Sequence, residues 1–222
     1  MKSSLKTCFL IFIFFTLSTY NTKHNRDSFS LFFPIKEILV QNNIATNALE
    51  LKSDLSFLIN SSFLFLDEEK ILDNIKKNEY ISTNKNKKKY PNTIKIEILE
   101  EIPVAIQITD KKKFYITKGN KKINFINLKI YENLPLIFGK HKNFNIFYDD
   151  LEKNNFKINQ IKAFYYFEVD RWDIVLKNEK TIKFPDKNYL DLLPKINSML
   201  DDNNFSKYNI FDFRIKDQLI LQ

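Results

Sequence analysis

The chain has 222 residues, of which 44% are hydrophobic and 22 are Phe, and this apolar content excludes a disordered chain. The formal net charge is +8, but four basic residues within the first 26 positions supply half of it, so the remainder is nearly balanced. A basic nucleic-acid-binding face is therefore not expected, and the lysine runs at 87–89 and 111–113 are interpreted as solvated loops or turns.

The N-terminal residues carry a targeting signal. Lys2 and Lys6 precede an apolar run from Cys8 to Leu17. A run of about 10 to 14 apolar residues is short for a spanning helix, which needs about 20, and fits a signal-peptide core. Because no small-x-small cleavage site follows, we predict a retained membrane anchor over residues 7–20, a cytoplasmic tail over residues 1–6 and an exported remainder. A cleaved signal peptide is the alternative.

A first folded unit is predicted over residues 32–103. Its elements are a strand at 35–40, helices at 47–59 and 68–77, and a strand at 93–100, which a polar stretch rich in Asn and Lys precedes. Asp67 is a good N-cap for the second helix. The predicted order is βααββ, an α+β unit with its helices on one face of a small sheet.

A second unit is predicted over residues 104–222 as a mixed sheet with packed helices. Its first strands are expected at 105–109, 114–117, 122–127, 136–138 and 158–169, with a helix at 143–153. Residues 171–185 alternate as a hairpin, and a helix that Asp186 caps and Pro194 bends then leads to a terminal strand at 210–221. A terminal strand easily forms an open sheet edge, and such an edge invites pairing with another chain.

The sequence contains no pattern typical of an active site. His24 and His141 belong to no cluster with metal-ligand spacing, and two glycines, Gly119 and Gly139, make a phosphate-binding loop implausible. Cys8 is the only cysteine, so the exported part has no disulfide framework. We therefore predict no catalytic residue, no metal and no cofactor. The acidic pairs at 100–101, 149–150 and 201–202 leave an exported hydrolase as an alternative.

Three spaced blocks resemble the FtsQ/DivIB family of bacterial cell division proteins. The family pattern P-x-T-L-x-I-x-V-x-E-R-x-P-V-A is matched from Pro91 to Ala105, and the pattern R-W-D-L-x-L-x-N-G-x-x-x-x-L-P from Arg171 to Pro185. The family's I-D-L-R ending is matched by residues 211–214. Two departures concern turns, because Asn42 or Asn43 and Glu179 stand where the family has Gly. Asn tolerates the positive φ that such a turn needs.

The resemblance implies a membrane-anchored protein of the cell inner membrane with its N-terminus cytoplasmic and its bulk periplasmic. It also implies a POTRA domain, a following β domain, and a non-enzymatic role in recruiting and linking division proteins at the septum. In the family the last strands of the β domain take up a segment of FtsB, which is itself paired with FtsL. Carried over to this chain, the docking edge is expected at 210–219 with Arg171 and Trp172 nearby. The expected partner-binding residues are Arg171, Trp172, Ile210, Phe211, Phe213, Arg214, Ile215, Asp217 and Leu219.

No nucleic acid and no small-molecule substrate is expected as a partner. Trp172 is also read as a packing residue of the core, and Arg171 as a partner of Asp170 or Asp173. A POTRA-type outer-membrane assembly or transport factor is the remaining alternative function.

Overall fold

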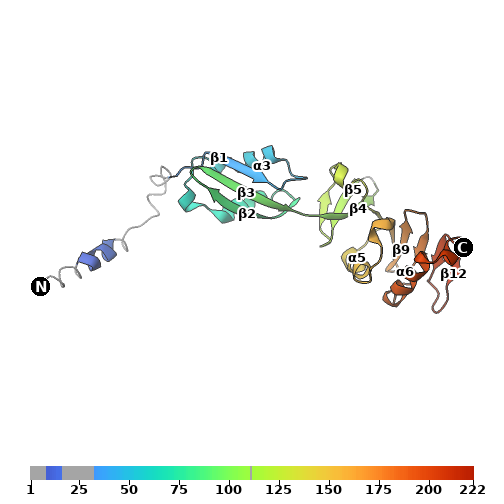
Figure 1. Cartoon of the computed structure of the whole chain (residues 1–222). Coiled ribbons are helices and arrows are strands. Elements are labelled where there is room, and N and C mark those ends of the chain that lie inside the picture. Colours follow the sequence, from blue (N-terminus) through green and yellow to red (C-terminus); the bar gives the residue numbers. More distant parts are fainter. Residues whose placement is uncertain (1–8, 17–32, 111) are drawn as a thin grey trace. The chain divides into compact units, whose positions relative to one another are not determined.

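The computed structural model describes residues 9–16, 33–110 and 112–222 (Figure 1). Residues 9–16 are helical, and no described helix has both the length and the apolar character needed to cross a membrane. The predicted tail at 1–6, and much of the predicted anchor at 7–20, lie outside the described residues. The chain forms two compact units, Met1–Glu100 and Glu101–Gln222.

The first unit has the predicted βααββ order. Its three-stranded sheet has the order β1-β3-β2, in which β1 is parallel and β2 antiparallel to β3. The elements are β1 (Glu37–Gln41), α3 (Ala48–Asp54), the short 3-10 turns η2 (Ser56–Leu58) and η3 (Phe63–Phe65), α4 (Glu68–Ile75), β2 (Ile81–Lys89) and β3 (Thr93–Glu100). Leu51 of α3 and Ile71 of α4 pack with the β3 isoleucines in one core, so the fold is α+β.

The local signals in the first unit act as predicted. The Asp67 side chain accepts a hydrogen bond from the backbone N–H of Lys70 at 3.0 Å and so caps α4. Asn42 has a φ of 65°, the conformation in which the family uses Gly. The polar stretch before Tyr90 differs from the prediction. The sequence predicts a connecting segment there, but the stretch forms most of β2, an edge strand whose lysines face solvent.

Glu100 holds one end of this unit together. Its carboxylate accepts three backbone hydrogen bonds, from Ile44 at 3.0 Å and from Ala45 and Thr46 at 2.8 Å. Glu100 is only 9% exposed. The end of β3 is thereby tied to the loop between β1 and α3, whose N–H groups have this carboxylate as their acceptor.

The second unit is a mixed nine-stranded sheet with the order β12-β11-β10-β9-β8-β7-β4-β5-β6. Its strands are β4 (Pro103–Thr109), β5 (Lys112–Thr117), β6 (Lys122–Asn124), β7 (Leu136–Phe138), β8 (Ile161–Phe167), β9 (Arg171–Leu176), β10 (Thr181–Lys183), β11 (Ile210–Asp212) and β12 (Ile220–Leu221). The longer helices are α5 (Phe144–Lys153) and α6 (Leu193–Asp201). The pairs β4–β7, β7–β8 and β10–β11 are parallel, and the others are antiparallel.

Several predicted details of the second unit are wrong. The strand expected at 122–127 ends at Asn124, and Lys112 and Lys113, interpreted as part of a loop or turn, begin β5. The strand expected at 158–169 begins only at Ile161, because Ile158–Gln160 form a 3-10 turn. The helix expected after Asp186 begins at Leu193, so Pro194 lies in the first turn, where its missing N–H costs nothing, and does not bend the helix. The terminal strand is two strands, β11 and β12, separated by a turn at 213–219.

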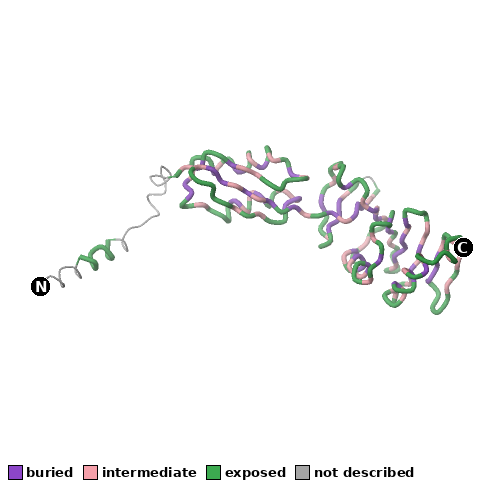
Figure 2. The backbone as a smooth tube through the Cα atoms, viewed as in Figure 1, coloured by how far each residue is buried: buried purple, intermediate pink, exposed green. Residues whose placement is uncertain are grey.

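An aromatic cluster forms the centre of the second core, which Figure 2 shows as buried segments of the strands and helices. Trp172 of β9 is 6% exposed, and its ring stacks on Phe147 of α5 with the centroids 5.1 Å apart and the planes at 7°. Phe144, Phe164 and Tyr166 surround the same indole. The interpretation of Trp172 as a core residue is therefore confirmed.

Candidate functional site

The two edge strands of the second sheet are β6 and β12, and the edge nearest to the predicted docking segment 210–219 is β12 and not that segment itself. The strand β11 lies between β10 and β12, so its backbone groups are paired on both sides. Ile210 and Gln222 exchange both backbone hydrogen bonds, at 2.9 and 3.1 Å. Since antiparallel strands alternate in this respect, the N–H and C=O of Leu221 point to the open side. An added strand would pair there.

The predicted partner-binding residues divide into buried and accessible groups. Phe211, Phe213 and Trp172 are 0%, 4% and 6% exposed, and all three belong to the core. Their direct contact with a partner stays a prediction; their burial gives them a packing role in the core, and Phe213 also lines the cavity described below. Ile215 is 51% exposed. The remaining predicted residues, Arg171, Ile210, Arg214, Asp217 and Leu219, are exposed or half-buried.

A row of alternating charges crosses three neighbouring strands. Asp173 of β9 and Asp212 of β11 both stand opposite Lys183 of β10 in the strand register. Arg171 Nε lies 3.3 Å from an oxygen of Asp173. Arg214 donates from Nε and from its terminal nitrogen to the Asp212 carboxylate, at 2.8 and 2.6 Å. The arginines predicted to meet a partner are thus already paired within the chain.

The two carboxylates of this row differ in their surroundings. Burial raises the pKa of the Asp173 carboxyl, and nearby cations, Arg171 first among them, only partly offset the effect. The hydrogen bonds from Arg214 lower the pKa of Asp212 and so keep it ionised. Sequence alternation alone places these side chains on one face, but it does not show how they pair.

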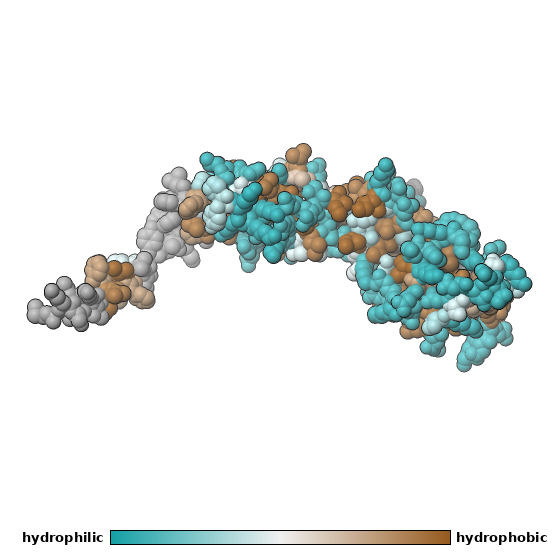
Figure 3. Space-filling model, viewed as in Figure 1, coloured by the Kyte–Doolittle hydropathy of each residue, from teal (hydrophilic) through white to brown (hydrophobic). Residues whose placement is uncertain are grey.

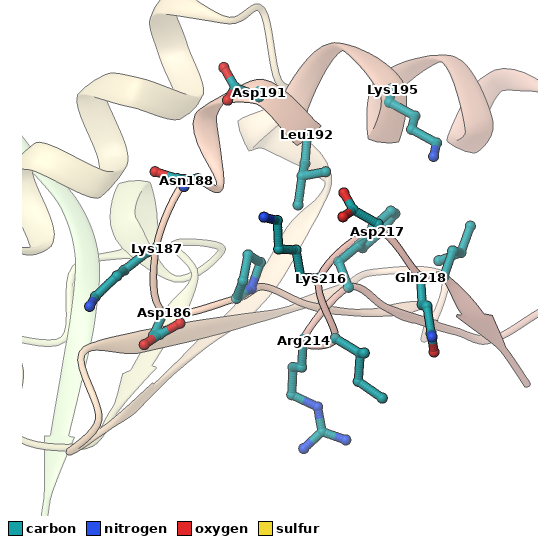
Figure 4. Close-up of a pocket in the computed structure, with 14 residues that line it drawn as sticks. Asp186, Lys187, Asn188, Asp191, Leu192, Lys195, Arg214, Lys216, Asp217 and Gln218 are labelled. Atoms are coloured by element: carbon teal, nitrogen blue, oxygen red, sulfur yellow. The ribbon is translucent and has the colours of Figure 1, made fainter.

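A cavity of about 600 Å³ adjoins the turn between β11 and β12 (Figure 4). One wall is the segment 213–219, and the other is formed by residues from Pro185 to Lys195. Figure 4 shows Leu192 facing the turn, while Arg214 points away from the segment that carries Leu192. The charged residues that line the cavity are Asp186, Lys187, Asp191, Lys195, Arg214, Lys216 and Asp217. Apart from residues of the turn, sequence reasoning missed this lining, for which the only signal is the irregular stretch after β10.

Lys180 fixes the loop that precedes β11. Its ammonium group donates to three backbone carbonyls, those of Phe205 and Tyr208 at 2.9 Å and that of Ser206 at 3.2 Å. The same group lies 5.1 Å from the ring centroid of Phe211. The turn of the β9–β10 hairpin thereby fixes the position of the loop that leads into β11.

Replacing Lys180 with Met is expected to destabilise this edge by about 2 kcal/mol, because three carbonyls lose a charged donor while the aliphatic stem is retained. The measurement is hydrogen exchange of the amides of β11 and β12 together with urea unfolding. Lys177→Met, at an exposed position of the same turn, is the matched control and should leave both unchanged. Equal protection in the two variants would contradict this role.

The acidic pairs considered for catalysis have structural partners. Glu100 binds backbone amides, and Glu101 lies 3.2 Å from Lys121. Asp150 accepts a hydrogen bond from the Tyr189 hydroxyl at 2.6 Å, and Asp202 caps a short turn. Within residues 9–16, 33–110 and 112–222, no group of His, Cys, Asp and Glu side chains is arranged to hold a metal ion.

The fold defines a class of protein: a βααββ unit followed by a mixed sheet with open edges, to which another chain can add a strand. Comparison with known proteins shows which proteins the chain resembles. The model of the family "POTRA domain, FtsQ-type" matches residues 33–101. A protein of Rickettsia conorii is 28% identical over 167 residues, 72% of this chain and 60% of its own length. Proteins of Rickettsia felis and Rhizobium meliloti are each 24% identical, covering 97% and 86% of this chain and 83% and 63% of their own lengths.

All three relatives carry the name "Cell division protein FtsQ". The relatives and the family model support the resemblance of this chain to the FtsQ/DivIB family, and its first unit matches the model of an FtsQ-type POTRA domain. The resemblance carried by the three sequence blocks is confirmed.

Proposed function

We propose that the protein is a non-enzymatic scaffold that recruits and links division proteins at the septum. In this proposal residues 7–20 anchor it in the inner membrane, with residues 1–6 cytoplasmic and the bulk periplasmic. A POTRA-like domain then occupies residues 32–103 and a β domain residues 104–222. The resemblance to the family and the apolar N-terminal run support this arrangement.

The β domain binds a coiled-coil membrane partner of the FtsB/FtsL type at the β12 edge. The observation that carries the proposal is the open edge at Leu221, two residues along the chain from Leu219, which lines a cavity with both apolar and charged walls. An extended segment of the partner pairs with β12, and an adjoining segment fills the cavity beside Ile215. Main-chain pairing supplies affinity, and the cavity supplies specificity. Phe211 and Phe213 contribute by holding β11 in the core.

The test measures binding of the full chain, in detergent, to an FtsB/FtsL-type coiled-coil pair. Ile215→Lys places a charge at the cavity and is expected to weaken binding at least about tenfold, a difference of about 1.4 kcal/mol. Ile146→Lys on α5 is the control, because Ile146 is 55% exposed and lies outside the cavity lining. Binding is measured by fluorescence anisotropy. Equal binding by both variants would overturn the site, and normal division in depleted cells would overturn the scaffold role.

A further inference from the structure

Three segments meet at the end of the first unit where the described chain enters it. The backbone N–H of Phe63 donates to Phe33 at 3.2 Å, and that of Lys36 donates to Asn92 at 2.7 Å. The parallel register of β1 with β3 places Glu37 opposite Thr93, so the start of β1 lies beside the β2–β3 turn. We call this end, residues 33–37, 63–65 and 88–92, the entry pole. The chain leaves the unit at the other end of β3.

The entry pole exposes large apolar side chains. Phe33 and Tyr90 are 51% and 65% exposed, and their rings meet edge to face at 6.4 Å. Leu64 and Phe65 of η3 are 55% and 46% exposed. Figure 3 shows hydrophobic surface at this end of the unit. Phe33 also has a φ of 57°, an uncommon conformation for a bulky residue, so strain accompanies the exposure of this ring.

Basic side chains surround these rings. Lys36, Lys88 and Lys89 are exposed, and none forms an ion pair with an acid of the described residues. Lys87, one step further along β2, differs because it is paired with Glu97 at 2.7 Å. The acid at the pole, Glu37, accepts a hydrogen bond from the Thr93 hydroxyl at 2.9 Å. The pole thus combines aromatic rings with a net positive charge, because Lys36, Lys88 and Lys89 outnumber Glu37.

We propose that the entry pole rests on the surface of a lipid bilayer that contains anionic headgroups. The rings of Phe33 and Tyr90 enter the interfacial layer, and Lys36, Lys88 and Lys89 contact the phosphates. Aromatic rings at headgroup level and lysines beside them are the combination that an anionic membrane surface attracts.

The position of the pole along the chain favours lipid over a protein occupant. Residues 9–16 form an apolar helix, and the chain from Thr16 to Phe33 reaches at most about 60 Å even when extended. The inference therefore rests on the proposed anchor, which keeps this end of the unit within reach of the bilayer. The membrane then orients the POTRA domain directly and does not merely tether it.

The experiment uses the full chain, reconstituted in vesicles, with a single environment-sensitive fluorophore. In a Cys8→Ser background the label is placed by Lys89→Cys at the pole or by Ser53→Cys, an exposed position of α3. Vesicles are phosphatidylcholine alone or phosphatidylcholine with phosphatidylglycerol. In anionic vesicles the emission of the label at position 89 is expected to shift to the blue, and lipid-borne quenchers are expected to quench it. The label at position 53 is expected to show neither effect in either kind of vesicle. High salt should reduce the effect.

A second variant keeps the proposal falsifiable. Tyr90→Ser, in the chain labelled at position 89, removes an exposed ring and is expected to abolish most of the shift, whereas Leu49→Ser, at a residue 77% exposed on α3, leaves it intact. Flotation with the vesicles reports the anchor separately. Chains that fail to float would overturn the anchored arrangement and the proposal with it. If the chains float but the emission of the label at position 89 is that of a fluorophore in water, the contact between the entry pole and the bilayer is overturned and the anchor is not. A shift that needs an added division protein would overturn the lipid assignment.

Discussion

Trp172→Ala is expected to remove about 3–5 kcal/mol from the free energy of unfolding of the second unit. The indole is almost fully buried and stacks on Phe147, so its loss leaves a cavity between β9 and α5 that the surrounding rings cannot fill without moving. Since a domain is stabilised by about 5–15 kcal/mol in total, this change leaves the unit close to unfolding. Far-UV circular dichroism during urea denaturation measures the effect. Tryptophan fluorescence cannot be used, because Trp172 is the only tryptophan and the variant lacks it.

Val169→Ala provides the control for this substitution. Val169 is 63% exposed and lies in the turn that follows β8, so its truncation should change stability by less than about 0.5 kcal/mol. Hydrogen exchange separates the two units, and protection in the POTRA domain should stay the same in both variants. If Trp172→Ala unfolds at the same urea concentration as the control, the stacked cluster does not hold the sheet to α5.

Glu100→Gln is expected to cost the POTRA domain about 2–4 kcal/mol. The carboxylate accepts three backbone hydrogen bonds, whereas an amide has one acceptor oxygen and brings an NH2 group against the remaining N–H donors. Donors left unsatisfied in a nearly buried loop lose their hydration without compensation. Thermal unfolding and exchange of the Ile44, Ala45 and Thr46 amides report the loss.

Glu97→Gln makes the same chemical change three residues earlier on β3. Glu97 pairs with Lys87 and Lys95 at the surface, and the hydrogen bonds from these lysines lower its pKa to about 2. Surface ion pairs contribute little to stability, so this variant should unfold at nearly the same temperature as the unmodified chain. If Glu100→Gln and Glu97→Gln lose a similar amount of stability, the burial of Glu100 does not strengthen the contribution of its hydrogen bonds.

The sequence predicts the fold where the pattern is local. The strand at 136–138 and the cap at Asp67 follow from residues within a few positions. The position of β2 is missed, although the predicted order contains the strand, because a solvated edge strand lacks the apolar alternation that marks a strand.

The candidate site is less predictable because it depends on contacts between distant segments. Alternation places Phe211 and Phe213 on one face and Asp212 and Arg214 on the other, but which face is buried depends on α6 and the preceding strands. Arg214 is a different case, because its partner Asp212 is only two residues away. Sequence alone allows two roles for Arg214, because an arginine beside a sheet edge can pair with an acid of its own chain or with an acid of a partner.

The parallel pairing of β10 with β11 has a consequence for the order in which the second unit assembles. The hairpin of β9 and β10 closes a short loop, whereas Lys183 meets Asp212 only after the intervening chain, including α6, has folded back across the sheet. Contacts between distant positions form slowly because loop closure costs entropy before the contacts form. The β11–β12 edge is thus expected to form late during folding and to open first under stress, so competence to dock a partner reports that the rest of the unit has folded.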